Sequence, residues 1–344
     1  MSSSATLETT ARALVAPGKG ILAADESHAT VARRFETYGI ANSEENRRRY
    51  RQMLFTTKSI GEFISGVILF DETIRQAADD GRPLVEVLAR EGILPGIKVD
   101  RGAKPLAGAP GEQVTEGLDG LRERLVEYKK LGARFAKWRA VIVIGEDGRT
   151  PTRRGIEVNA HALARYAALC QEAEIVPVVE PEVLMDGGHS IERCFEVTEA
   201  TLHAVFHALW EQNVRLEGLL LKPNMVLPGA ASPRQVPVEE VAEATVRCLR
   251  RTVPGAVPGV VFLSGGQSDE RATAHLNAMN RLPGPQPWPL SFSYARALQA
   301  APLRTWGGDP ARVADAQRAF FHRARCNSAA RSGAYTPELE RGAA

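Results

Sequence analysis

Short apolar runs alternate with amphipathic stretches along almost the whole chain. Helical periodicity fills the intervals between eight runs that are dominated by apolar side chains. We expect strands over residues 20–25, 63–70, 93–99, 133–143, 175–180, 218–222, 259–264 and 290–294. Continuous apolar strands separated by helices are typical of a parallel sheet that is covered by helices.

Eight such units within 344 residues fit a closed (β/α)8 barrel built as one domain. An open, doubly wound sheet is the rival fold, and it would usually carry a glycine-rich turn after its first strand. Residues 23–28, which read AADESH, are not such a turn. We therefore predict an α/β TIM barrel over residues 1–328 with extra N- and C-terminal helices. Residues 329–344 lack apolar periodicity, and we predict that they form a mobile C-terminal tail.

Composition and charge exclude several classes of partner. The 43 basic and 41 acidic residues leave a net charge of +2, so nothing global favours nucleic acid or an anionic membrane. The four cysteines are widely spaced without a CxxC pair, which indicates reduced, buried thiols. The N-terminus lacks the features of a secretory signal, and no apolar stretch reaches the roughly 20 residues of a membrane helix. These features predict a cytoplasmic protein with no membrane partner.

An apolar run ends in a lysine at Lys222, directly before Pro223. Proline cannot donate a hydrogen bond to a central ladder, so the strand should stop at the lysine. This places a primary amine at the C-terminal mouth of a buried strand, where a desolvated amine can attack a carbonyl group. The alternative is a lysine whose side chain extends to solvent from a strand end.

In a (β/α)8 barrel the C-terminal ends of all strands meet on one rim, where active sites lie. The charged and polar residues that this rim would gather are Asp25, Lys98, Lys137, Arg139, Glu180, Glu182, Lys222, Ser264 and Arg296. Neighbouring strands would place Glu180 between Lys137 and Lys222. A cationic Lys137 would favour the neutral form of Lys222, and the glutamate could move the protons of a carbinolamine. The alternative is a layer of salt bridges without function, but burying this many charges is costly.

Two groups of residues suggest binding of phosphate. Ser264 and two glycines follow the seventh strand, and Arg296 follows the eighth, which is a common phosphate-binding position in barrels. Further cations stand on the other side of the mouth, namely Arg34, Lys98 and Arg139. Two separated basic pockets would suit a substrate that is phosphorylated at both ends. The Gly-Gly pair alone is weak evidence, because it is more often a simple turn.

A catalytic metal finds little support in the sequence. His203 and His207 have i, i+4 spacing, but Ala204 stands where an HExxH motif has glutamate. We interpret both as ordinary surface or packing histidines and expect no metal and no cofactor, because a protonated iminium is itself the electron sink.

With these residues assembled, the chain closely resembles the class I, Schiff-base fructose-bisphosphate aldolases. The resemblance runs in order from about residue 5 to residue 337. It is carried by residues 21–27, 66–70, 96–100, 135–139, 179–182, 219–225, 262–268 and 291–294.

The resemblance implies a role for each rim residue. Lys222 would form the Schiff base with the ketose carbonyl, and Glu180 would serve carbinolamine formation and dehydration. Asp25 would take the C4 hydroxyl proton, while Lys137 would assist iminium formation with support from Glu182. The phosphate and substrate contacts would come from Ser264, Gly265, Ala295 and Arg296 at the C1 end, and from Ser27, Thr30, Arg34, Lys98 and Arg139 at the other end. The implied reaction is reversible cleavage of fructose 1,6-bisphosphate to dihydroxyacetone phosphate and glyceraldehyde 3-phosphate, by a cytoplasmic homotetramer.

Two departures from the family pattern stand out. Ala295 replaces the glycine before the phosphate arginine, and alanine disfavours positive φ. Vertebrate members end in a tyrosine that speeds enamine protonation, whereas the last tyrosine here is Tyr335. We therefore expect slower protonation or protonation by another group. A zinc-dependent aldolase and an idle scaffold for acidic partners remain as rival functions, and the sequence does not rank the bisphosphate against fructose 1-phosphate or sedoheptulose bisphosphate.

Overall fold

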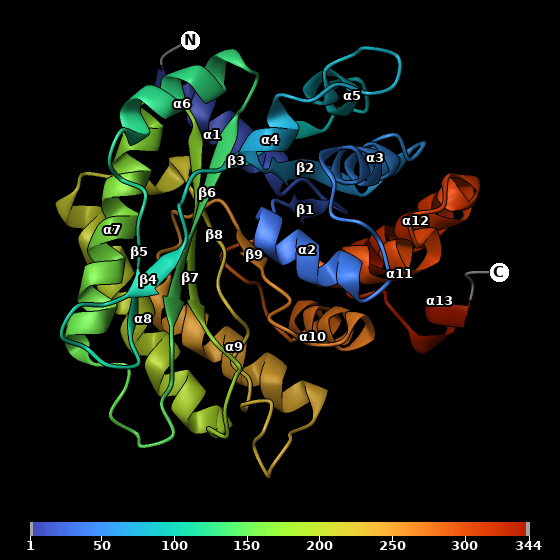
Figure 1. Ribbon diagram of the computed structural model, residues 1–344. Coiled ribbons are helices and arrows are strands. Elements are labelled where there is room, and N and C mark those ends of the chain that lie inside the picture. The colour runs from blue at the N-terminus through green and yellow to red at the C-terminus, as the bar shows by residue number, and fades with distance from the viewer. Residues whose placement is uncertain (1–2, 342–344) are drawn as a thin grey trace.

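Eight parallel strands close into a barrel in the computed structural model, which describes residues 3–341 (Figure 1). Around the ring the order is β1, β2, β3, β6, β7, β8, β9 and β10, and β10 pairs with β1 to close it. The strands are β1 (Gly20–Ala24), β2 (Ile64–Leu69), β3 (Leu94–Lys98), β6 (Phe135–Ile142), β7 (Val176–Val183), β8 (Leu220–Leu221), β9 (Val260–Phe262) and β10 (Leu290–Tyr294). The predicted TIM barrel and all eight predicted strands are confirmed.

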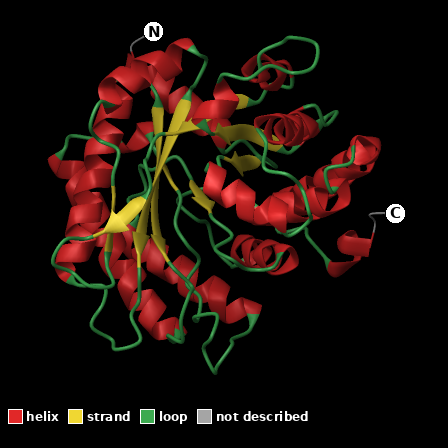
Figure 2. Cartoon of the chain, in the orientation of Figure 1, coloured by secondary structure: helices red, strands yellow, loops and turns green. Residues whose placement is uncertain are grey.

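Helices surround the barrel on its outside (Figure 2). They are α1 (Ser3–Leu14), α2 (His28–Glu36), α3 (Glu44–Phe55), α4 (Asp71–Ile74), α5 (Leu84–Arg90), α6 (Leu121–Lys130), α7 (Arg153–Glu172), α8 (Ile191–Glu211), α9 (Val238–Thr252), α10 (Asp269–Arg281), α11 (Arg296–Trp306), α12 (Val313–Arg331) and α13 (Pro337–Arg341). Serine or threonine side chains cap several of them, as Thr152 does at the start of α7 and Ser268 at the start of α10. These caps fix where the helices that follow the strands begin.

A small antiparallel hairpin lies outside the barrel, in the segment between the strands that we expected at 93–99 and 133–143. It pairs β4 (Ala103–Pro105) with β5 (Gln113–Thr115). The hydroxyl of Thr115 donates to the carbonyl of Arg139 at 2.8 Å, which ties the hairpin to β6. Strands of three residues in a segment rich in glycine and proline carry too little alternation to be recognised from sequence.

The barrel interior is filled with apolar side chains and is covered at one end by α1. Leu14 of that helix clusters with Phe135 and Val261, which point inward from two strands. Gly96 on the strand beside Phe135 makes room for the ring, because a Cβ at this glycine would lie within 2.3 Å of it. The interior is therefore a packed core at this end, and a cavity opens toward the C-terminal ends of the strands.

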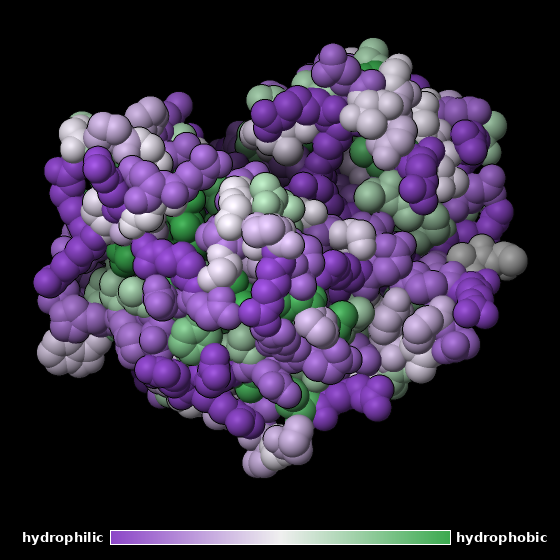
Figure 3. Space-filling model, turned by 90° about the horizontal axis from the view of Figure 1, so that it is seen from below, coloured by the Kyte–Doolittle hydropathy of each residue, from purple (hydrophilic) through white to green (hydrophobic). Residues whose placement is uncertain are grey.

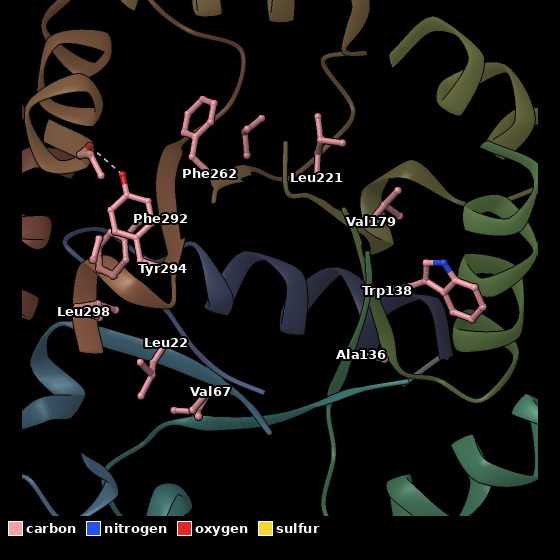
Figure 4. Packing of buried hydrophobic residues seen from close by; sticks show 14 of the residues in the cluster. Leu22, Val67, Ala136, Trp138, Val179, Leu221, Phe262, Phe292, Tyr294 and Leu298 are labelled. Atoms are coloured by element: carbon pink, nitrogen blue, oxygen red, sulfur yellow. Dashed lines mark hydrogen bonds between the residues drawn. The ribbon is translucent and has the colours of Figure 1, made fainter. Parts of the chain in front are cut away.

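A second and larger apolar cluster lies between the barrel and the helices. Outward-facing side chains of the strands, among them Trp138, Val179 and Phe262, point toward the helical layer (Figure 4). Tyr166 of α7 packs against Trp138 and donates its hydroxyl to the carbonyl of Ala136 at 2.7 Å. This layer holds the strands in register, so the residues at their ends are placed by a rigid frame.

The chain beyond the predicted domain boundary at residue 328 contacts the rest of the protein at a few residues, among them Tyr335 and Leu339. Helix α12 continues to Arg331, three residues past that boundary. Tyr335 is buried, and its backbone N–H donates to the side-chain oxygen of Asn277 on α10 at 3.0 Å. The mobility of this segment in solution stays a prediction, and residues 342–344 lie outside the described residues.

Polar side chains cover most of the face seen in Figure 3, with apolar side chains in small patches between them. Among the described residues, no helix has both the length and the apolar character needed to cross a membrane. All four cysteines are buried and unpaired, as the sequence predicted.

Candidate active site

A cavity of about 510 Å³ opens where the C-terminal ends of the strands meet. Every site residue that the sequence predicted lines it. These residues are Asp25, Ser27, Thr30, Arg34, Lys98, Lys137, Arg139, Glu180, Glu182, Lys222, Ser264, Gly265, Ala295 and Arg296. They come from seven different strands or from the segments that directly follow them. The barrel thus brings together residues that are up to 271 positions apart in the chain, between Asp25 and Arg296 (296 − 25).

Lys222 lies directly after the two-residue strand β8, as Pro223 leads one to expect. Its backbone N–H donates to the carbonyl of Val179 at 2.8 Å, which is the last strand bond before the proline. The side chain is buried, and its Nζ lies 3.3 Å from Oε1 of Glu180. Asn224 anchors the turn, because its side-chain oxygen accepts from the N–H of Val183 at 3.0 Å. The amine is therefore held inside the cavity and does not extend to solvent.

Lys137 is the centre of a buried cluster of charges. Its Nζ lies 2.6 Å from Asp25, 3.5 Å from Oε2 of Glu180 and 3.9 Å from Asp100. Burial alone would lower the pKa of Lys137, but the carboxylates of Asp25 and Glu180 outweigh burial and raise it above its usual value. Lys137 is consequently a permanent cation at neutral pH.

The pKa of Asp25 is shifted in the direction opposite to that of Lys137. Burial would raise its pKa, but the cations Lys137 and Lys222 hold it well below the usual range of a carboxyl group. Asp25 is thus deprotonated at neutral pH, which is the form that can accept a proton. The contact with Lys137 also has to loosen as that proton arrives, because a protonated carboxyl no longer attracts the amine.

Glu180 links the two lysines, as its place on β7 predicted. One carboxylate oxygen faces Lys222 and the other faces Lys137. Within the described structure the oxygen that faces Lys137 is buried and accepts no hydrogen bond. A buried carboxylate with a free acceptor position can exchange protons with a bound reactant.

Glu182 and Arg139 form an ion pair on neighbouring strands at the edge of the cavity. Burial would lower the pKa of Arg139, but Glu182 raises it. The backbone N–H of Arg139 donates to Asp100 at 3.2 Å, and Lys98 lies 3.5 Å from the same carboxylate. Asp100 therefore positions two of the predicted phosphate ligands, a role that was not predicted from the sequence although Asp100 lies two residues after Lys98.

The loop after β9 is shaped by two glycines in the left-handed region. Gly265 has φ of 59° and Gly266 has φ of 92°. A Cβ at Gly266 would lie 3.3 Å from Nη2 of Arg296, so the glycine lets the guanidinium approach the loop. Ala295 has φ of −99°, a conformation that any residue adopts. The alanine at this position consequently introduces no strain.

Arg296 and Arg34, which were predicted for opposite ends of the substrate, also line a common space. Both line a smaller cavity of about 160 Å³ beside the main one. Burial lowers the pKa of Arg296, and the charge of Arg34 lowers it further. Two cations that repel one another in this way favour the binding of anionic groups at this edge of the cavity.

The cavity also has lining residues that were not predicted, among them Glu26 and Ser293. Glu26 is buried below Arg34 and binds it, and it also lies 2.6 Å from Arg51 and accepts from Gln299 at 2.7 Å. Burial would raise the pKa of Glu26, but Arg51 and Arg34 hold it below its usual value. Ser293 lines the cavity with a hydroxyl that has no partner among the described residues. The sequence could have indicated Glu26 as a cavity residue only through its position next to Asp25, just after the first strand.

The histidine pair on α8 stands apart from the site, as expected. Both rings are exposed, and His207 lies 3.4 Å from Glu211 on the same helix. Neither His203 nor His207 lines the cavity.

Comparison with known proteins supplies the family. A family model described as fructose-bisphosphate aldolase class-I matches residues 6–344. A probable fructose-bisphosphate aldolase class 1 of Xanthomonas campestris is 62% identical over 95% of this chain and 97% of its own length. The fructose-bisphosphate aldolase of Dictyostelium discoideum is 54% identical over 98% and 95%, and cytosolic fructose-bisphosphate aldolase 4 of Arabidopsis thaliana is 54% identical over 95% and 82%.

A solved structure agrees with these sequence relatives. The fructose-bisphosphate aldolase of Plasmodium falciparum, crystallised with TRAP and a small-molecule inhibitor, has a TM-score of 0.96 and 53% identity, covering 97% of this chain and 96% of that one. On these grounds the chain belongs to the class-I fructose-bisphosphate aldolase family.

Proposed function

We propose that Lys222 carries the covalent chemistry of this enzyme, which as a class-I aldolase cleaves fructose 1,6-bisphosphate reversibly into dihydroxyacetone phosphate and glyceraldehyde 3-phosphate. The observation that supports this most strongly is the position of Glu180 between two buried lysines, 3.3 Å from the amine of Lys222. An amine that forms a Schiff base needs a nearby group that both gives and takes protons, and this carboxylate meets that need.

The first half of the reaction builds the iminium. Nζ of Lys222 attacks the C2 carbonyl carbon of the ketose, and the resulting carbinolamine loses its hydroxyl as water. Glu180 first accepts a proton from the lysine nitrogen and then supplies it to the hydroxyl that leaves as water. Lys137 is a fixed cation 3.5 Å from Glu180, so it stabilises the carboxylate that remains.

The second half breaks the carbon–carbon bond. Asp25 accepts the proton of the C4 hydroxyl, the C3–C4 bonding electrons move into the iminium, and the aldehyde product leaves. Protonation of the enamine at C3 and hydrolysis then release dihydroxyacetone phosphate and restore Lys222. The hydroxyl of Tyr335 donates to Glu340 on the outside of the barrel, so we propose that another group protonates the enamine.

The phosphate groups are assigned by charge and backbone shape. Ser264, Gly265 and Ala295 with Arg296 are proposed to hold the C1 phosphate, because all four line the cavity and Gly265 has a positive φ that opens the loop. The proposed ligands of the other phosphate are Ser27, Thr30, Arg34, Lys98 and Arg139. Glu182 supports this end by binding Arg139.

We further propose that the enzyme is a cytoplasmic homotetramer that acts in glycolysis and gluconeogenesis. The cytosolic relative in Arabidopsis supports the location, and the family resemblance supports the assembly. Light scattering on the eluting peak of a gel-filtration column measures the mass, and a dimer or monomer would contradict the assembly.

Replacement of the nucleophile tests the proposed role of Lys222. Lys222→Ala removes the amine, whereas Lys222→Arg keeps a cation that cannot attack a carbonyl at neutral pH. Both variants should lose aldol cleavage, and the wild type should keep its activity in EDTA. Full activity in Lys222→Ala would overturn the assignment, and loss of wild-type activity in EDTA would favour a metal-dependent aldolase instead.

A further inference from the structure

Three side chains of different chemistry converge where the C-terminal helix α13 meets α12, on the outside of the barrel. His322 and Cys326 stand one helical turn apart on α12, and Glu340 faces them from α13. The imidazole Nε2 lies 3.6 Å from the thiol Sγ and 3.8 Å from Oε2 of Glu340. All three potential ligand atoms lie within 4.8 Å of one another.

The nitrogen–sulfur separation matches an edge of a zinc coordination tetrahedron, and the nitrogen–oxygen separation is slightly longer than one. With metal–ligand bonds of about 2.0–2.3 Å, tetrahedral zinc places its nitrogen, oxygen and sulfur ligands roughly 3.4–3.6 Å apart. A thiolate, an imidazole and a carboxylate are all established zinc ligands, and the thiolate disfavours magnesium or calcium. We propose that His322, Cys326 and Glu340 bind a zinc ion that fastens α13 to α12, with water as the fourth ligand.

The site is shielded as a structural metal site needs to be. Cys326 is fully buried, and the side chains of His322 and Glu340 are 11% and 21% exposed. Without a metal, burial raises the pKa of the Cys326 thiol to about 11. Zinc binding therefore displaces one proton from this thiol as the Zn–S bond forms.

Outer partners hold the carboxylate in place. The hydroxyl of Tyr335 donates to Oε1 of Glu340 at 2.7 Å, and Arg323 binds Oε2. Hydrogen bonds of this kind orient metal-binding carboxylates. The charge of Arg323 opposes that of the metal, so it weakens binding while it positions Glu340. Arg323 also donates to Thr273 of α10 at 2.7 Å, which links the cluster to a second helix.

This zinc site would be separate from the chemistry at Lys222. None of its three ligands lines the cavity at the barrel mouth. The proposal therefore does not rest on the assigned function, and removal of the metal should loosen the C-terminal segment without stopping aldol cleavage.

Cobalt substitution tests the site directly. The full-length protein is stripped with a chelator and titrated with Co²⁺, whose thiolate complexes give a charge-transfer absorption band. We expect one cobalt ion per chain, a thiolate band that Zn²⁺ abolishes by competition, and a higher Tm with Zn²⁺ than in EDTA. Cys326→Ser should lose the band, and Tyr335→Phe should weaken binding by about 10-fold.

Matched variants exclude binding elsewhere. Cys248→Ser removes another buried thiol, on α9, and should keep the band unchanged. Should Cys326→Ser fail to fold, His322→Gln and Glu340→Gln serve in its place, and each should weaken cobalt binding by at least about 10-fold. Absence of a thiolate band in the wild type, or an equal band in the wild type and the ligand variants, would overturn the proposal.

Discussion

The carboxylate of Glu180 lies 3.3 Å from the amine of Lys222, and both side chains are buried. This contact joins the end of β7 to the end of β8 across the barrel mouth. A buried amine beside a buried carboxylate is a costly arrangement, and its occurrence at the end of a packed barrel indicates a chemical use.

Glu180→Gln should slow the enzyme strongly while the fold persists. Glutamine keeps the shape of the side chain but does not exchange protons, so formation and dehydration of the carbinolamine lose their catalyst. We expect kcat to fall by about 10²–10⁴-fold. Steady-state kinetics measure this, with Glu239→Gln on the exposed start of α9 as the control. Unchanged kcat in Glu180→Gln would show that another group moves these protons.

Gly266→Ala should weaken substrate binding at the phosphate loop. The added Cβ would crowd the Arg296 guanidinium, and alanine resists the φ of 92° at this position. We expect KM to rise about 10-fold or more, since 1.4 kcal/mol of lost binding corresponds to that factor. Gly81→Ala is a matched control, because Gly81 has φ of 82° and open space around its Cβ position. Equal KM values in the two variants would exclude the proposed contact.

Arg51→Met should destabilise the protein and disturb Arg34. The guanidinium of Arg51 is 3% exposed and pairs with buried Glu26, which also binds Arg34. Removal of one partner of such a pair costs about 3 kcal/mol in the free energy of unfolding. Urea denaturation measures the loss. Arg49→Met, which removes an exposed arginine one position before Tyr50, should change stability by less than about 0.5 kcal/mol. Comparable losses in both variants would contradict this account of Glu26.

Stability should fall on mild acidification because of His275. Burial lowers the pKa of this histidine to about 4, and Arg271 adds to the effect. A histidine whose pKa is depressed in the folded state stabilises the protein above its unfolded pKa, and that contribution is lost as pH falls toward the folded pKa. We expect a loss of about 2 kcal/mol between roughly pH 7 and pH 5 from this group.

Replacement of His275 isolates this contribution. In His275→Gln the loss of unfolding free energy between the same two pH values should shrink, whereas in the exposed-residue control His203→Gln it should match the wild type. An undiminished pH dependence in His275→Gln would assign the effect to other groups.

The strands and most of the cavity could be predicted from sequence, and the reason is visible at Lys222. An apolar run that stops at a charged residue before a proline predicts both a strand and the residue where it ends. In a (β/α)8 barrel the C-terminal ends of all strands then lie together on one rim. The order of the strands likewise predicted Glu180 between Lys137 and Lys222, where the structure has it.

What sequence reasoning missed depends on contacts between distant segments. Glu26 is a site residue because Arg51 and Gln299 pack beneath it, 25 and 273 positions further on (51 − 26 and 299 − 26). The strands of hairpin β4–β5 have three residues each, too few for an alternation of apolar and polar residues to be recognised. Tyr335 is held by hydrogen bonds with Asn277 and Glu340, and no local sequence pattern predicts these contacts.

The central claim is that Lys222 forms a Schiff base with the substrate, and chemical trapping tests it most directly. The enzyme is mixed with fructose 1,6-bisphosphate or dihydroxyacetone phosphate, reduced with borohydride and digested, and the modified peptide is identified by mass spectrometry. The account predicts a reduced triose or hexose phosphate adduct on Lys222 and on no other lysine, including Lys98 and Lys137. An adduct on either of those lysines, or an active enzyme that yields none, would contradict it.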